Sequence, residues 1–189
     1  MLNMLESKLI MIMGCPGSGK STLASEVHTN LKKKNKNSIF ISEVATDYIA
    51  EFGVPKTAMD QMVIFYKQLN KEKMFFDKKE FIICDSSSIL NYFYFRQLFD
   101  KKLHNKDIAA INNIQKEILK HINNIHKIYF VPYLEQEDLD DGVRFHNVDQ
   151  VKKLDVLIKS YLNLENIEYV DLSDIDIVER ADYIINDLT

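Results

Sequence analysis

The sequence predicts an α/β fold in which helices cover both faces of a parallel β-sheet. Short apolar runs that suit buried strands alternate with longer segments of helical spacing along the chain. A glycine-rich segment also joins the first apolar run to the first helical segment, a junction found in folds of this class. We therefore expect a three-layer α/β/α sandwich built on a five-stranded parallel sheet.

The first half of the chain is expected to contain three strands. Residues 8–13 (KLIMIM) form the first apolar run, and the helix that follows begins at Ser21. A second strand over 38–42 leads into a short helix over 44–52, which Gly53 and Pro55 end. A long helix over 57–79 follows, because its apolar residues recur near helical spacing, and it precedes a third strand over 81–84.

The second half is expected to alternate in the same way. An aromatic-rich helix over 86–99 and a helix over 107–124 with a stripe of isoleucines precede a fourth strand over 127–131. A polar, acidic loop over 132–147 then leads into a helix over 147–163 and a fifth strand over 167–170. We expect Ser173 to cap a final helix that runs to the end.

Length and composition favour one domain over residues 1–189, because this length suffices for a substantial core. No run approaches the roughly 20 apolar residues of a membrane span, and the N-terminus lacks the features of a signal peptide. Cys15 and Cys84 indicate neither a disulfide framework nor a metal cluster, so we expect a cytoplasmic protein. The net charge of −4 argues against sequence-independent binding along duplex DNA.

Residues 14–21 (GCPGSGKS) match the phosphate-loop pattern G-x-x-x-x-G-K-[ST] at every fixed position. Glycines allow the backbone amides to turn toward a phosphate, and the helix start adds a positive dipole end. Lys20 can reach the β- and γ-phosphates of a nucleotide, and the Ser21 hydroxyl can join the ligand shell of Mg²⁺. We therefore expect a site for ATP and Mg²⁺ formed by Gly14, Cys15, Pro16, Gly17, Ser18, Gly19, Lys20, Ser21 and Thr22.

Acidic residues follow the second and third predicted strands, whose carboxyl ends should meet the phosphate loop at one edge of the sheet. Asp85 follows four apolar residues, which is the general form of a second nucleotide-binding motif whose carboxylate holds Mg²⁺ or its waters. It also stands where it could cap the next helix. Glu43 could position a substrate hydroxyl and accept its proton, or it could only stabilise a helix start. We predict Ser21 and Asp85 as metal ligands, and Lys20, Glu43 and Asp85 as catalytic residues.

Arginine is scarce, and Arg144 lies in the polar loop after the fourth strand. Its planar guanidinium could close over the γ-phosphate and stabilise the transferring charge. The alternative is a surface arginine paired with Asp140 or Asp141. We predict Arg144 as a fourth catalytic residue.

Aromatic residues gather in the segment 92–99, where they could stack on a planar ring, although core packing is the more common role of such residues. The members are Tyr92, Phe93, Tyr94, Phe95 and Phe99. The five histidines show no metal-ligand spacing, so we predict no metal site beyond Mg²⁺.

Three segments resemble the AAA-type P-loop kinase-like family that includes the nicotinamide-riboside kinase domain of the bacterial NAD regulator. Residues 43–48 (EVATDY) resemble its E-x-A-R-x-Y segment, and residues 84–93 (CDSSSILNYF) are similar to its D-T-D-x-x-T-T-x-x-Y segment. Residues 141–144 (DGVR) resemble its D-G-[LV]-R lid motif. Thr46 and Ser87 depart from this pattern, at positions where the family often has arginine and a second acid.

The resemblance implies a kinase that uses ATP and Mg²⁺ to phosphorylate a hydroxyl of a nucleoside-like small molecule, such as nicotinamide riboside or a (deoxy)nucleoside. It also implies that Glu43 contacts the acceptor, that Asp85 serves the metal or the acceptor, and that Arg144 closes from a lid at about 132–147. The sequence does not define the oligomeric state.

Three alternatives remain open. The spelling GCPGSGKST also resembles phage polynucleotide 5′-kinases, so the hydroxyl could belong to a nucleic acid or a DNA base. A nucleoside-monophosphate kinase would need further cationic groups, which this arginine-poor chain offers sparingly. A nucleotide-switched ATPase or interaction module would bind nucleotide tightly and turn over slowly.

Overall fold

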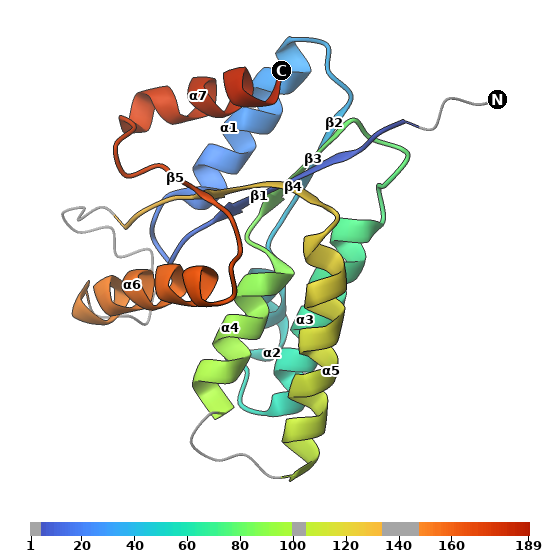
Figure 1. Cartoon of the computed structure of the whole chain (residues 1–189), viewed down its shortest axis with the longest axis vertical. Helices are drawn as coiled ribbons and strands as arrows, with labels where there is room; N and C mark the ends of the chain where they lie inside the picture. The colour runs from blue at the N-terminus through green and yellow to red at the C-terminus, as the bar shows by residue number, and fades with distance from the viewer. Residues whose placement is uncertain (1–4, 100–104, 134–147) are drawn as a thin grey trace.

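The computed structural model describes residues 5–99, 105–133 and 148–189, and these residues form the three expected layers (Figure 1). Five parallel strands make one sheet in the order β2-β3-β1-β4-β5. The strands are β1 (Lys8–Met13), β2 (Ser38–Ile41), β3 (Phe81–Asp85), β4 (Ile125–Phe130) and β5 (Val170–Asp171). The predicted fold class is therefore confirmed.

Helices cover both faces of this sheet. Figure 1 shows α1 (Lys20–Lys33) and α7 (Arg180–Leu188) on one side. On the other side lie α2 (Val44–Phe52), α3 (Ala58–Lys73), α4 (Ser88–Phe99), α5 (Asn105–Ile122) and α6 (Val148–Leu164). In the described parts of the chain, no helix has the length and apolar character needed to cross a membrane.

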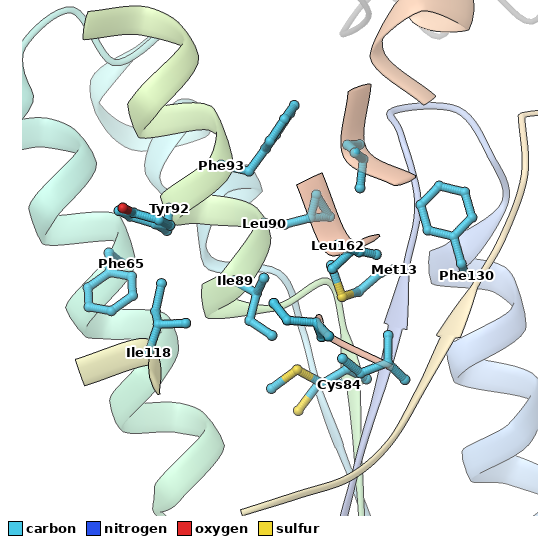
Figure 2. Packing of buried hydrophobic residues seen from close by; sticks show 14 of the residues in the cluster. Met13, Phe65, Cys84, Ile89, Leu90, Tyr92, Phe93, Ile118, Phe130 and Leu162 are labelled. Carbon is cyan, nitrogen blue, oxygen red and sulfur yellow. The ribbon is translucent and has the colours of Figure 1, made fainter. Parts of the chain in front are cut away.

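Strand β1 supplies side chains to both layers, because successive residues of a strand point to opposite faces. Leu9, Met11 and Met13 pack with the helices from α3 to α6, whereas Ile10 and Ile12 pack with α1 and α7. Figure 2 shows Met13 in the first of these clusters, together with Cys84 of β3 and residues of α3, α4 and α6. Burial on both faces explains why the strand reads as a continuous apolar run.

Most element boundaries lie close to those expected, but three expectations were wrong. The fifth strand was expected over 167–170, whereas β5 comprises only Val170–Asp171. Helix α3 ends at Lys73 instead of continuing to residue 79, and Asp77 adopts a left-handed conformation in the turn toward β3. Ser173 does not cap the last helix, because its backbone N–H and its hydroxyl donate to Asp171. Asp176 instead caps a short 3₁₀ turn (Ile177–Glu179) that leads into α7.

The strand order determines where a ligand can bind. β1 lies in the middle of the sheet, with β3 on one side and β4 on the other. The connection from β1 to β2 runs toward one edge of the sheet, whereas the connection from β3 to β4 crosses β1 toward the other edge. In open parallel sheets a crevice forms at the carboxyl ends of strands where the order reverses. The segments that follow β1, β2 and β3 all begin at this edge.

Candidate active site

The phosphate loop has the backbone geometry that its glycines were expected to provide. Gly17 and Gly19 have φ angles of 81° and 84°, in the left-handed region that glycine adopts without strain. Gly14 packs so tightly that a Cβ on it would lie 2.5 Å from both the Ser18 Oγ and the Val131 carbonyl oxygen. The Ser18 Oγ is buried without a hydrogen-bond partner. The loop is thus a compact concave turn at the N-terminus of α1, which is an anion-binding arrangement.

The catalytic lysine and serine candidates lie beside the predicted acid. Asp85 ends β3 directly opposite Ile12 of β1, so its carboxyl group projects at the level of the loop. The Ser21 hydroxyl and the Lys20 ammonium both lie close enough to the Asp85 carboxyl group to favour its charged form. The structure therefore brings Lys20, Ser21 and Asp85 together.

Burial raises the pKa of Asp85, and the nearby charge of Glu43 acts in the same direction. The Ser21 hydroxyl and the Lys20 charge oppose this shift without cancelling it. The Asp85 Oδ1 atom is buried and has no hydrogen-bond partner. Buried carboxylate oxygens normally have a hydrogen-bond donor, because burying one without a partner costs free energy. The Asp85 Oδ1 atom is therefore available to bind a ligand.

Asp85 does not cap the helix that follows it. The Ser87 Oγ accepts the hydrogen bond from the Leu90 N–H and so caps α4. Ser86 adopts a left-handed φ of 74°, and its N–H donates to the Ile12 carbonyl oxygen at 3.0 Å. The three serines after Asp85 therefore make the turn into α4, which leaves the carboxyl group facing the crevice.

Glu43 stands at the N-cap position of α2, yet its side chain makes no capping bond to the helix backbone. Its Oε2 accepts a hydrogen bond from the Thr46 hydroxyl at 2.9 Å. The same carboxyl group contributes to the raised pKa values of Asp85 and Tyr94. Glu43 and Asp85 therefore lie at one site, at the tips of the adjacent strands β2 and β3.

Two further residues lie at this site: Tyr94, which the sequence analysis named among the aromatic residues that could stack on a planar ring, and Asp155, which it did not name. Burial raises the pKa of the Tyr94 hydroxyl, and the nearby charge of Glu43 adds to the shift, so Tyr94 of α4 lies near Glu43. Asp155 of α6 accepts a hydrogen bond from the Tyr133 N–H at 3.1 Å, and its carboxyl group lies close to the Cys15 thiol. Burial and this carboxyl group raise the pKa of Cys15 to about 12, which keeps it a neutral thiol.

The residues present fit Mg²⁺ bound together with a nucleotide. The Ser21 hydroxyl and the unpartnered Asp85 oxygen are hard oxygen donors, the type that Mg²⁺ requires. No group of three or more His, Cys, Asp or Glu side chains suited to a metal gathers in residues 5–99, 105–133 and 148–189. Mg²⁺ commonly uses one or two carboxylates plus phosphate oxygens and waters, so a site with few protein ligands suits it.

The remaining sequence-based predictions have mixed outcomes. Arg144 and residues 134–147 of the expected lid lie outside the described residues, as does the side chain of Phe99. Tyr92, Phe93 and Phe95 are buried in the core, as the more common role of aromatic residues suggested. Figure 2 shows Tyr92 and Phe93 in the cluster with Phe65 of α3 and Leu162 of α6.

Comparison with known proteins agrees with this geometry. A family model described as an AAA domain matches residues 9–180. A crystal structure of the NadR protein in complex with NR is similar with a TM-score of 0.70 and 19% identity, over 96% of this chain and 50% of that one. The chain thus spans about half the length of that NadR chain.

A deoxyadenosine kinase from M. mycoides, solved with products bound, is similar with a TM-score of 0.60 and 14% identity, over 95% of this chain and 97% of that one. No curated protein matches this sequence. At these identities the structural similarities show the fold. Together with the family match, they confirm the resemblance to the P-loop kinase-like family that the sequence motifs indicated.

Proposed function

The chain belongs to the AAA-domain family, and from that premise we propose that it is a phosphotransferase that uses ATP and Mg²⁺ to phosphorylate a hydroxyl of a nucleoside-like small molecule. One observation supports this most directly. The unpartnered carboxylate oxygen of Asp85 lies beside Ser21 and Lys20 of the phosphate loop, and Glu43 lies at the next strand tip. A nucleotide site and a second carboxylate that can face an acceptor are thus adjacent.

Each residue has a role that follows from its chemistry. The loop amides and Lys20 bind phosphate oxygens and hold the γ-phosphoryl group in line with the acceptor. Ser21 and Asp85 hold Mg²⁺, which when bound neutralises charge on the phosphates. As the acceptor oxygen forms its bond to phosphorus and the bond to ADP breaks, Glu43 takes the hydroxyl proton. We assign to Arg144 the role of stabilising the transferring charge from the lid.

A small nucleoside-like acceptor is supported by two similar proteins, one solved with NR and the other a deoxyadenosine kinase. Tyr94 lies near Glu43, where its ring can flank a planar group of the acceptor. The net charge of −4 disfavours a long nucleic acid as the acceptor. We also place the protein in the cytoplasm, because its two cysteines are free and buried.

The test is a transfer assay with Mg²⁺-ATP and separate acceptors: nicotinamide riboside, the deoxynucleosides, a nucleoside monophosphate and a single-stranded oligonucleotide. We expect one of the first two classes to gain one phosphoryl group by mass spectrometry, and we expect Lys20→Ala to slow this gain by at least about 100-fold. Phosphorylation of only the oligonucleotide or the monophosphate would replace the proposed acceptor class. ATP hydrolysis without phosphorylation of any acceptor would overturn the proposal.

A further inference from the structure

Helix α3 carries two polar side chains that are fully buried and one helical turn apart, Gln68 and Glu72, each 0% exposed. Neither belongs to a sequence motif, and the hydrogen bonds that both accept come from the starts of other helices. Uncompensated polar groups are costly to bury, so both need partners in the interior. Their partners are the starts of two other helices.

Gln68 and Glu72 each accept a hydrogen bond from the first residue of another helix, although the Gln68 Nε2 itself has no hydrogen-bond partner. The Val44 N–H donates to the Gln68 Oε1 at 3.0 Å, and the Ser88 N–H donates to the Glu72 Oε1 at 2.7 Å. Val44 is the first residue of α2 and directly follows Glu43, whereas Ser88 is the first residue of α4 and closely follows Asp85. One helix therefore holds both backbone segments that carry the acidic residues of the site.

Glu72 is held firmly in this position. Its Oε2 accepts from the Ser88 hydroxyl at 2.8 Å and contacts the Nε2 of His121 at 2.8 Å. His121 belongs to α5 and is 1% exposed, so the carboxyl group links α3, α4 and α5 in the interior. Burying a carboxylate and an imidazole is a poor way to gain stability compared with apolar packing. This arrangement is better explained by the position it imposes on α4.

The turn between Asp85 and Ser88 can transmit that position. Ser86 holds a left-handed conformation that a non-glycine residue keeps only where its surroundings determine it. Its N–H is bonded to Ile12 on one side, and Ser87 caps α4 on the other. A shift of Ser88 therefore moves Asp85 relative to Ser21, and a shift of Val44 moves Glu43 in the same way.

We infer that Gln68 and Glu72 are positioning residues, through which α3 sets Glu43 and Asp85 at the geometry that the acceptor and Mg²⁺ require. This inference rests on the proposed function for the roles of the two acids. It assigns different consequences to the two residues. Glu72 acts on the metal side through Asp85, whereas Gln68 acts on the acceptor side through Glu43.

The first experiment measures ADP binding by calorimetry with and without Mg²⁺. Glu72→Leu leaves the affinity for ADP without Mg²⁺ unchanged. It reduces the gain in ADP affinity that Mg²⁺ provides by about tenfold, the usual cost of losing a group that orients a metal ligand. Glu72→Gln retains the gain. Its amide oxygen still accepts from Ser88 N–H, and its NH₂ can donate to the Ser88 hydroxyl or to His121, whose Nδ1 has no partner and can carry the proton.

The matched control is Gln61→Leu, a buried polar residue of the same helix about two turns before Gln68, which should change neither affinity. Should Glu72→Leu fail to fold, Ser88→Ala removes only the hydroxyl bond to Glu72 and should reduce the Mg²⁺-dependent gain in the same direction. Equal losses in Glu72→Gln and Glu72→Leu, or no loss in Glu72→Leu, would overturn the assignment of Glu72.

The second experiment measures transfer kinetics. Gln68→Leu lowers kcat/KM for the acceptor by about tenfold, part of what a well-placed general base contributes, and leaves Mg²⁺-dependent ADP binding intact. Gln68→Glu keeps an oxygen for the Val44 N–H and retains activity. If Gln68→Leu changed ADP binding and transfer equally, its separate role would be refuted. If the parent protein phosphorylated no acceptor, the proposed function would fail, while the ADP measurements would still test Glu72.

Discussion

Replacing Gly14 with alanine tests the geometry of the phosphate loop directly. A Cβ at this position would lie 2.5 Å from the Ser18 Oγ and 2.5 Å from the Val131 carbonyl oxygen. The Ser18 hydroxyl can rotate away, because it has no hydrogen-bond partner. The Val131 oxygen is backbone, and the Val131 N–H donates to the Met13 carbonyl oxygen at 2.7 Å, so it cannot move freely. Either the loop or the end of β4 must shift.

The expected cost has two parts. Overpacking of this kind destabilises proteins by about 1–3 kcal/mol, which urea unfolding would measure. A displaced loop also misaligns the amides that hold phosphate oxygens. We therefore expect Gly14→Ala to weaken ATP binding at least about tenfold, which corresponds to about 1.4 kcal/mol, as measured by calorimetry with Mg²⁺ present.

Gly53→Ala is the matched control. Unlike Gly14, Gly53 has a left-handed φ of 81°, no atom lies within 4 Å of its Cβ position, and it stands at the C-terminal end of α2. Alanine there should cost about 1–2 kcal/mol of backbone strain and leave ATP affinity unchanged. If Gly14→Ala bound ATP as tightly as the parent protein, or if both variants weakened binding equally, the reasoning about this loop would be refuted.

Three further predictions concern other parts of the molecule. Lys20→Ala should reduce transfer by about 10²–10³-fold or more, whereas Lys36→Ala, which removes a surface ion pair with Glu80, should leave initial rates unchanged. Asp85→Asn should abolish the Mg²⁺-dependent gain in ADP affinity and yet stabilise the fold at neutral pH. Burial holds the pKa of Asp85 above its ordinary 3.8, so its contribution to stability is present at acid pH and lost as pH rises through the folded-state pKa. The stabilisation by Asp85→Asn in urea unfolding should therefore shrink toward acid pH, and a variant less stable than the parent at pH 7 would contradict this. Tyr129→Phe should lower the free energy of unfolding, measured in urea, by about 1 kcal/mol, because the phenol donates a hydrogen bond to Asp187 of α7. ATP affinity should stay unchanged, and a change in it would contradict our conclusion that this contact lies apart from the site.

Much of the site could be predicted from sequence because its chemistry is local. The phosphate loop needs its glycines, lysine and serine within one short segment, and the acids Glu43 and Asp85 follow directly from apolar strands. A parallel sheet then brings the strand ends to one edge whatever the details of packing. The fold class, and the succession of strands and helices along the chain, could likewise be predicted from the alternation of apolar and helical segments.

Other features depended on competition between near-equal local choices. Asp85, Ser86 and Ser87 could each have capped α4, and Ser173 and Asp176 could each have begun the last helix. The structure assigns the caps to Ser87 and Asp176, and the local sequence does not distinguish these outcomes. Asp155 belongs to no sequence motif. It reaches the site only because α6 packs so that its carboxyl group lies close to Cys15 of the phosphate loop.

An anion site with a lysine, a serine and two candidate acids could be predicted from the sequence alone, because these residues are neighbours along the chain or follow successive strands. Helix packing, by contrast, leaves one Asp85 oxygen without a partner and buries Gln68 against Val44 and Glu72 against Ser88 and His121. The physical reason is that buried hydrogen bonds join residues far apart in sequence. Their donors and acceptors can be paired only once the helices have packed.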